Sequence, residues 1–204
     1  MGLKHGLDTA QGIQAPGAGV EGLLQRRRFT VADYEAMVDA GILTEDDRVE
    51  LLDGDVVEKM TINPPHSGCV NRMNRLFVQR LGDRAVVQPQ NPIVLDDYSM
   101  PEPDIALLRP DEDFYATARP QVQDVLLAIE VADTSLARDR IVKLPLYARA
   151  GVPEVWIVNV PARRIEVFKG PADDGYRESR IIDEGALTPE AFPDLALGID
   201  ELLG

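Results

Sequence analysis

Two acidic side chains stand in apolar segments where buried strands are expected. Asp104 opens the apolar run 105–108, and Glu130 interrupts the segment VLLAIEVA, residues 125–132. Burying a carboxylate is costly unless a partner compensates its charge. Two neighbouring carboxylates also repel, so the pKa of one rises unless a cation lies between them. Because a hard divalent cation prefers oxygen ligands, we expect Asp104 and Glu130 to lie on neighbouring strands and to share a metal ion.

Each of these two acids also has an ordinary structural explanation. Pro-Asp is common turn chemistry, so Asp104 could simply mark a strand end that meets water. Glu130 could lie at the end of its strand and reach water, or it could pair with an arginine, because acidic residues are rarely fully buried without a partner. The metal interpretation therefore depends on the two side chains meeting in space.

Glu50 and Lys143 are the candidates to complete such a site. Glu50 opens another apolar strand, ELL, although a glutamate at a helix–strand junction is also common. Helical spacing puts Lys143 on one face with Asp139 and Tyr147. An ammonium group there could stabilise charge that develops on a reacting phosphate or orient the attacking water. The alternative is a solvated lysine that pairs with Asp139 four residues earlier.

The first part of the chain is expected to supply two helices and a hairpin. TVADYEAMVDAG begins with a capping-box pattern of Thr30 and Asp33. Asp53-Gly54, between two apolar-rich arms, is a strong hairpin signal. After the breaker NPPH, apolar side chains recur on one side of HSGCVNRMNRLFVQRLG, as in an amphipathic helix. The expected elements are a helix within 30–41, paired strands at 48–52 and 55–60, and a helix within 66–82.

The remainder is expected to form strands around one further helix. A strand at 125–132, a helix at 135–150 and a strand at 152–160 would make a right-handed crossover. Pro145 should remove one hydrogen bond from that helix and bend it. Alternation of apolar and polar residues predicts a half-exposed strand at 163–170, with Glu166 outward. Further strands are expected at 84–89, 92–96, 103–109 and near 175–188, with a short helix near 199–203.

These elements predict a mixed α/β fold with a central sheet. The 204 residues suffice for one domain with a full core. Residues 1–25 contain glycines throughout and have no apolar stretch of signal-peptide length, so we expect them to be a flexible leader. Residues 26–204 are expected to form a single domain. The sequence has no apolar run long enough to span a membrane. Its single cysteine, Cys69, excludes an internal disulfide and fits a cytoplasmic location.

The net charge of −14, from 21 basic and 35 acidic side chains, weighs against broad binding of nucleic acid. Such binding normally shows as a basic surface. A local basic groove or bound metal ions can nevertheless offset the carboxylates at a site. The charge therefore limits the size of any surface that binds nucleic acid, and it is compatible with a small one.

Several motifs together resemble a known nuclease family. They are PD at 103–104 and IEVA at 129–132, with RFTVADYEAM, RVELLDGDVVE, PEPDIALL, LLAIEVADTSLARDRIVKLPLYARAGVPEVWIV and FPDLALGIDELL. The chain resembles the PD-(D/E)xK nuclease superfamily, which has the restriction-endonuclease-like fold, and within it the Uma-two family of bacterial restriction endonucleases. The resemblance covers most of the chain, and its longest motif is specific, whereas PD alone would carry little weight.

The resemblance implies a DNA endonuclease that depends on Mg²⁺ or Mn²⁺. Asp104 and Glu130 match the motif acids that ligate the metal, and Glu50 matches an upstream acid of the family, which adds a third ligand. Ala132 stands where the superfamily pattern has its lysine. In this family the corresponding lysine is placed on the helix that follows, and Lys143 is similar to it in position. The resemblance therefore implies that Asp104, Glu130 and Lys143 are the catalytic residues.

Other residues receive weaker assignments. His66 matches a histidine of the family, and at a helix start we interpret it as a cap or a local hydrogen bonder rather than as a catalytic group. Two clusters of arginine are the candidate DNA contacts. They are Arg72, Arg75 and Arg80 on the second helix, and Arg138, Arg140 and Arg149 around the third. A homodimer is expected by analogy with nucleases that cut both strands.

Two alternatives remain open from sequence. A catalytically degenerate protein could keep the fold and act as a binding or scaffold module, which Ala132 and the charge of −14 favour. A carboxylate-pair hydrolase of sugars would need no metal. The sequence holds one Trp, in an apolar strand, and so offers little of the aromatic surface expected of a sugar cleft.

Overall fold

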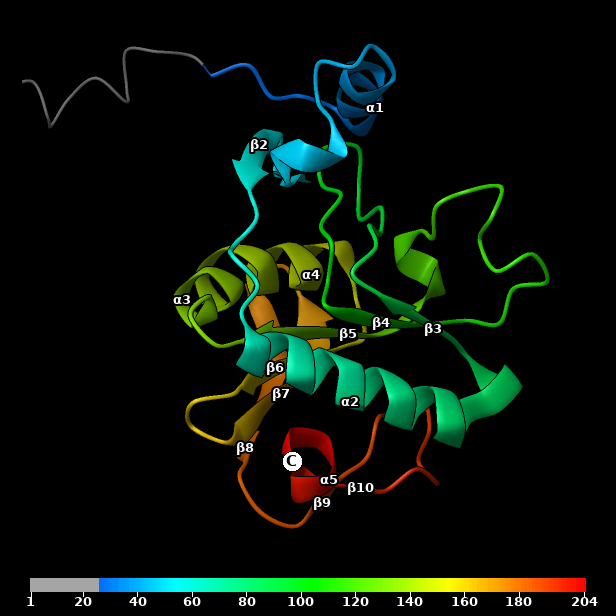
Figure 1. The fold of residues 1–204 in the computed structure, drawn as a ribbon, viewed down its shortest axis with the longest axis vertical. Helices are drawn as coiled ribbons and strands as arrows, with labels where there is room; N and C mark the ends of the chain where they lie inside the picture. Colours follow the sequence, from blue (N-terminus) through cyan, green and yellow to red (C-terminus); the bar gives the residue numbers. More distant parts are fainter. Residues whose placement is uncertain (1–25) are drawn as a thin grey trace, which may run out of the picture.

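The computed structural model describes residues 26–204. Their central element is a six-stranded sheet with the strand order β3-β4-β5-β6-β7-β8 (Figure 1). Its strands β5 and β6 are parallel, and the other neighbours are antiparallel. The mixed α/β fold class is thereby confirmed. The strands are β3 Val86–Pro89, β4 Ile105–Leu108, β5 Val125–Ala132, β6 Glu154–Asn159, β7 Arg164–Ala172 and β8 Gly175–Ile182.

Helix α2 (Pro64–Leu81) covers one face of this sheet (Figure 1). Its buried Met73 and Phe77 share a core cluster with Leu107 and Ile129. The helix begins earlier than expected, because Asn63 caps it and the two prolines of NPPH occupy its first turn, where a missing N–H costs no hydrogen bond. The C-terminal helix α5 (Ile199–Leu203) packs into the same cluster.

The opposite face is covered by the segment 136–150. Tyr147 shares a second core cluster with Ala106 and Ala128. Because side chains alternate along a strand, even-numbered residues of β4 and of β5 from Leu127 onward face this segment and odd-numbered ones face α2. The segment comprises helix α3 (Leu136–Arg138), a π-helical turn (Asp139–Lys143) and helix α4 (Leu144–Ala150).

A smaller layer precedes the sheet in the chain. Helix α1 (Val31–Asp39) starts at the expected capping box, and β1 (Val49–Leu52) pairs with β2 (Asp55–Glu58) in the expected hairpin. Leu51 accepts a hydrogen bond from the N–H of Met100 at 2.8 Å, which brings the hairpin beside the loop that leads into β4. The remaining short elements are β9 Ala186–Leu187, β10 Leu197–Gly198 and 3₁₀ turns at Glu45–Asp47, Gly82–Arg84 and Val122–Asp124.

Two expectations about strands were wrong. Residues 92–96 make isolated bridges through Val94 and Asp96 instead of a strand. Ile93 and Leu95 supply the apolar pattern because they are buried, but the N–H of Val94 donates to the carbonyl of Pro120 in a loop. Glu166 on β7, expected to face outward, is buried because Arg140 lies across it and pairs with its carboxylate.

Other expectations are untested by the fold. The predicted leader, residues 1–25, lies outside the described residues, and the single domain over 26–204 stays a prediction. Across 26–204, none of the helices combines the length and the apolar character needed to cross a bilayer.

Gly54 in the β1–β2 turn tests the close packing of the hairpin. Its φ is +84°, and a Cβ added there would lie 2.6 Å from the Cβ of Arg28. Gly54→Ala should therefore suffer both a left-handed backbone, about 1–2 kcal/mol, and an overpacking cost of about 1–3 kcal/mol. Gly41→Ala is the matched control, because Gly41 also has a positive φ but no atom within 4 Å of an added Cβ.

Urea unfolding of the two variants provides the measurement. We expect Gly54→Ala to lower the free energy of unfolding clearly more than Gly41→Ala does. Equal losses would show that Arg28 does not pack against this turn.

Candidate active site

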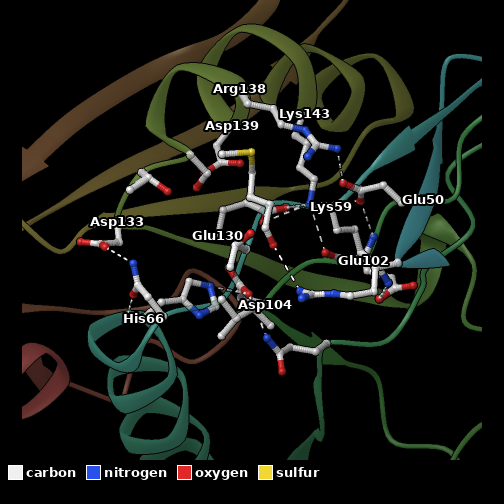
Figure 2. A pocket seen from close by; sticks show the side chains of 18 residues that line it. Glu50, Lys59, His66, Glu102, Asp104, Glu130, Asp133, Arg138, Asp139 and Lys143 are labelled. Carbon is white, nitrogen blue, oxygen red and sulfur yellow. Dashed lines mark hydrogen bonds and ion pairs between the residues drawn. The ribbon is translucent and has the colours of Figure 1, made fainter. Parts of the chain in front are cut away.

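The predicted acids meet at the edge of the sheet where β4 begins and β5 ends. The register pairs Ile105 with Ile129, so Asp104, one residue before β4, falls opposite Glu130. Both residues line one cavity, as Figure 2 shows. Its volume is about 380 Å³. Glu50 and Lys143 line the same cavity. The structure therefore brings together all four residues selected from sequence, while their roles as ligands and catalysts stay predictions.

Glu130 is an almost fully buried carboxylate, with 3% of its surface exposed. The hydroxyl of Tyr147 donates to its Oε1 at 2.6 Å, and Lys143 Nζ lies 3.1 Å from Oε1 and 3.2 Å from Oε2. Burial raises the pKa of Glu130 well above its usual value, and the charge of Lys143 opposes that rise. The alternative in which Glu130 reaches water is therefore wrong, and its cationic partner is a lysine rather than an arginine.

Lys143 is buried as well, with 6% exposed, and three oxygens surround its ammonium group. Besides the carboxylate of Glu130, Nζ contacts Glu50 Oε2 at 3.2 Å and donates to the carbonyl of Glu102 at 3.1 Å. Burial acts to lower the pKa of Lys143, but the surrounding carboxylates, Glu130 first, outweigh it and raise the pKa. The alternative of a solvated lysine is wrong, because this ammonium is buried among oxygens of the protein.

The π-helical turn positions Lys143 on the inner face. The N–H of Leu144 bonds the carbonyl of Asp139, five residues back, and Pro145 follows without an N–H of its own. The wider turn leaves Asp139 and Lys143 both buried toward the cavity. Asp139 accepts a hydrogen bond from Ser135 Oγ at 2.6 Å, and burial raises its pKa. Single π turns are frequent at functional sites, and this one places the ammonium group.

Glu50 ties the hairpin to this helical segment. Its Oε1 accepts a hydrogen bond from Arg138 at 2.7 Å. Its Oε2 accepts one from the N–H of Glu102 at 3.1 Å and faces Lys143. Both oxygens of the buried carboxylate are thus engaged by protein donors.

Asp104 is held from two sides. Its Oδ2 accepts the N–H of Val131 at 2.7 Å, and its Oδ1 lies 2.9 Å from His66 Nε2. This hydrogen bond raises the pKa of His66, and burial opposes the rise. Sequence reasoning misjudged His66: Asn63 is the cap of α2, and the imidazole instead reaches Asp104 across the sheet edge. The sequence signalled only that His66 matches a histidine of the family, and not which residue the imidazole would contact.

The rim of the cavity contains residues that sequence reasoning did not select. Lys59 pairs with Glu102 at 2.7 Å, and Asn63 donates to Asp133. Of the six arginines expected to contact DNA, Arg138 alone is among the residues lining this cavity. Several of the others contact groups elsewhere. Arg72 donates to the carbonyl of Leu203, whereas Arg80 pairs with Glu201, Arg140 pairs with Glu166, and Arg149 pairs with Asp53.

The donor set limits what metal ion would fit. Over residues 26–204, no three His, Cys, Asp or Glu side chains are grouped closely enough to hold a metal ion. Mg²⁺, however, usually keeps several waters and binds through one or two carboxylates. Asp104 and Glu130 can supply such an oxygen pair, because both line the same cavity. The two acids therefore fit Mg²⁺ or Mn²⁺, and the expected role of Glu50 as a third ligand stays a prediction.

Comparisons with known proteins agree with this architecture. The Uma2 family model, described as "Putative restriction endonuclease", matches residues 31–200. A crystal structure of a "putative nuclease belonging to DUF820" from Anabaena variabilis superimposes with a TM-score of 0.64 at 15% identity and covers 86% of this chain and 97% of that one. At that identity the likeness concerns the fold alone. No curated protein matches the sequence.

Replacing Lys143 with methionine tests the buried charge cluster. Without the ammonium, the buried Glu130 loses its cationic partner and Glu50 keeps only Arg138, so Lys143→Met should cost about 3–5 kcal/mol of unfolding free energy at pH 7. The pKa of Glu130 is already raised, so the folded variant binds a proton more readily than the unfolded chain. Its stability therefore falls as pH rises from the ordinary glutamate pKa through the raised one, and the loss should be smaller at pH 5.

Lys59→Met is the matched control. Lys59 and Glu102 form a partly exposed pair at the same cavity, so its removal should cost about 1 kcal/mol or less. Urea unfolding at pH 5 and pH 7 measures both variants. A loss in Lys143→Met that equals the control, or that does not change with pH, would contradict the assignment.

Proposed function

The chain belongs to the Uma2 family, and from this membership we propose that it is a metal-dependent endonuclease that hydrolyses phosphodiester bonds in DNA. The observation that supports the proposal is the meeting of Asp104 and Glu130 with a buried ammonium at one cavity. A purely structural ion pair would need one acid for one lysine. Here the cavity lining has six acidic side chains against four basic ones, and it encloses a space that a phosphate group could enter.

Asp104 and Glu130 would hold the ion in this proposal. A bound Mg²⁺ or Mn²⁺ would polarise the phosphate and lower the pKa of a water molecule. The N–H of Val131 and the imidazole of His66 fix the orientation of the Asp104 carboxylate. Tyr147 does the same for Glu130. Both acids are thus preorganised by donors that need not move during the reaction.

Lys143 would stabilise the negative charge that develops on the phosphate. Its ammonium is held by oxygens from three segments of the chain. The group is therefore already positioned, and it need not reorganise when negative charge develops on the phosphate. We assign Glu50 to holding Lys143 and Arg138 in place, and any contact of Glu50 with the metal would run through water. A homodimer that cuts both strands stays a prediction.

The scaffold alternative has one observation in its favour. Ala132, at the position of the superfamily lysine, is buried on β5, and both oxygens of Glu130 already accept hydrogen bonds within the protein. A closed network of this kind could serve stability alone. Metal binding separates the two proposals. A nuclease must bind a metal ion at Asp104 and Glu130, whereas a scaffold can keep the hydrogen bonds of Glu130 and bind none.

Calorimetric titration with Mn²⁺ is the direct test of the metal site. We expect binding to the unchanged protein that is lost in Asp104→Asn and in Glu130→Gln, since each removes one of two charged ligands. Asp194→Asn is the control, because Asp194 pairs with Arg84 on the exposed surface and does not line the cavity. Mn²⁺ binding that persists in both site variants, or that is absent throughout, would favour the scaffold.

Cleavage assays test the role of Lys143. With Mn²⁺ and labelled DNA, Lys143→Met should cut about 10²–10³ times more slowly than the unchanged protein, as expected when a preorganised group that stabilises charge is removed. Circular dichroism at the assay temperature establishes that the variant is folded. A folded variant with undiminished activity would remove Lys143 from the mechanism, and a chelator should abolish cleavage by both proteins.

A further inference from the structure

The groups proposed to react lie inside the cavity rather than on an open surface. Glu130 and Lys143 are buried, and the side chain of Asp104 is only 16% exposed. The walls come from segments far apart in the chain, namely the β1–β2 hairpin, the residues between β2 and α2, the start of α2, and the segment 133–143 (Figure 2). A phosphate must therefore enter between these walls to reach the acids.

The connection from β2 to α2, residues 59–63, forms part of this enclosure, and we call it the strap. In Figure 1 it runs from the hairpin past α3 to the start of α2. Lys59 at one end pairs with Glu102, and Asn63 at the other donates to Asp133. Between them, the carbonyl of Met60 accepts a hydrogen bond from Arg48 at 3.3 Å. The strap is thus fastened at both ends, with two contacts at its Lys59 end and one at Asn63.

A neighbouring contact closes the same side. Arg138 on α3 donates to the carbonyl of Glu58 at 2.7 Å, just before the strap, while its other nitrogen holds Glu50. The end of β2 is thereby joined to the helical segment that carries Lys143. These contacts hold the walls together beside Asp104, whose side chain is only 16% exposed. A single strand, which is more flexible than a duplex, would reach such a recessed carboxylate more readily.

The charges around the cavity do not form a surface for a duplex. Its lining has four basic side chains against six acidic ones, a net formal charge of −2 with His66 neutral. All four are already engaged: Arg48 with a carbonyl, and Lys59, Arg138 and Lys143 with carboxylates. Affinity for a duplex comes mainly from cations that neutralise several phosphates. This lining could instead accommodate one or two phosphates beside a divalent ion.

The strap also exposes apolar surface at the cavity. Met60 and Ile62 are 45% and 42% exposed, and both belong to the lining. The faces of nucleic-acid bases become available to apolar side chains only when the bases are unstacked or splayed out, as in single-stranded regions. An unpaired strand could place a base against these two side chains while its phosphate enters the cavity.

From these observations we infer that the substrate is an unpaired segment of DNA rather than an intact duplex. The inference rests on the proposed nuclease function and specifies its substrate class. Entry past the strap selects flexible strands, Met60 and Ile62 contact an unpaired base, and the buried acids act on the adjacent phosphate. A duplex is cut only after local unpairing, which carries an energetic cost.

Two closed circles of the same DNA sequence provide the test, one single-stranded and one a relaxed duplex, so that neither substrate has ends. With Mn²⁺, the single-stranded circle should be cut at least about tenfold faster, because the duplex must first open. Equal or faster cutting of the duplex would overturn the substrate inference and leave the nuclease proposal standing. Failure to cut either circle would overturn both.

Binding without metal gives a second readout of the strap. In the presence of a chelator, fluorescence anisotropy should show that the double variant Met60→Ser, Ile62→Ser binds a labelled single-stranded oligonucleotide several-fold more weakly than the unchanged protein. The matched control is Val38→Ser, Ile42→Ser, which alters two exposed apolar residues outside the cavity lining. Equal affinities of the two double variants would contradict a base contact at the strap.

Discussion

The site depends on one buried ammonium group. Lys143 is placed among the carboxylates of Glu50 and Glu130 and the carbonyl of Glu102, and each of these oxygens belongs to a different part of the chain. Carboxylates removed from water require a compensating cation. The charge of Lys143 therefore holds four parts of the chain together, namely the hairpin, the loop before β4, the end of β5 and the π-helical turn. The same interaction that stabilises the fold at this point also leaves acids directed toward a cavity, where a second cation would be attracted.

The surrounding architecture explains why the site forms at this edge of the sheet. Antiparallel register brings the start of β4 beside the end of β5, so Asp104 lies opposite Glu130. The crossover from β5 to the parallel β6 places its helix on the even-numbered face, where Tyr147 and Lys143 meet Glu130. The first turn of α2 then brings His66 to Asp104 from the other layer. The family match and the fold are consistent with a nuclease, and the burial of Glu130 and Lys143 is the basis of our inference that the substrate is an unpaired strand.

Much of the fold was predictable from local patterns. The capping box at Thr30, the Asp53-Gly54 turn and the apolar strand 125–132 each depend on neighbouring residues, and each was found as expected. Residue types also identified Asp104, Glu130, Glu50 and Lys143 as neighbours. Long-range pairing was not predictable: the contacts of His66 with Asp104, of Arg138 with Glu50 and of Arg140 with Glu166 join distant residues. The false strand at 92–96 arose because burial of Ile93 and Leu95 imitates a strand while the backbone bonds to loops.

The central claim is that Asp104 and Glu130 jointly bind a divalent ion in the cavity that also contains Lys143. Anomalous diffraction from crystals soaked in Mn²⁺ would test it most directly, because the method locates the ion without reference to activity. The account predicts an anomalous peak between the carboxylates of Asp104 and Glu130, with the ammonium of Lys143 beside it. A cavity without a peak, in crystals where manganese is found elsewhere or not at all and Lys143 still bridges Glu50 and Glu130, would contradict it.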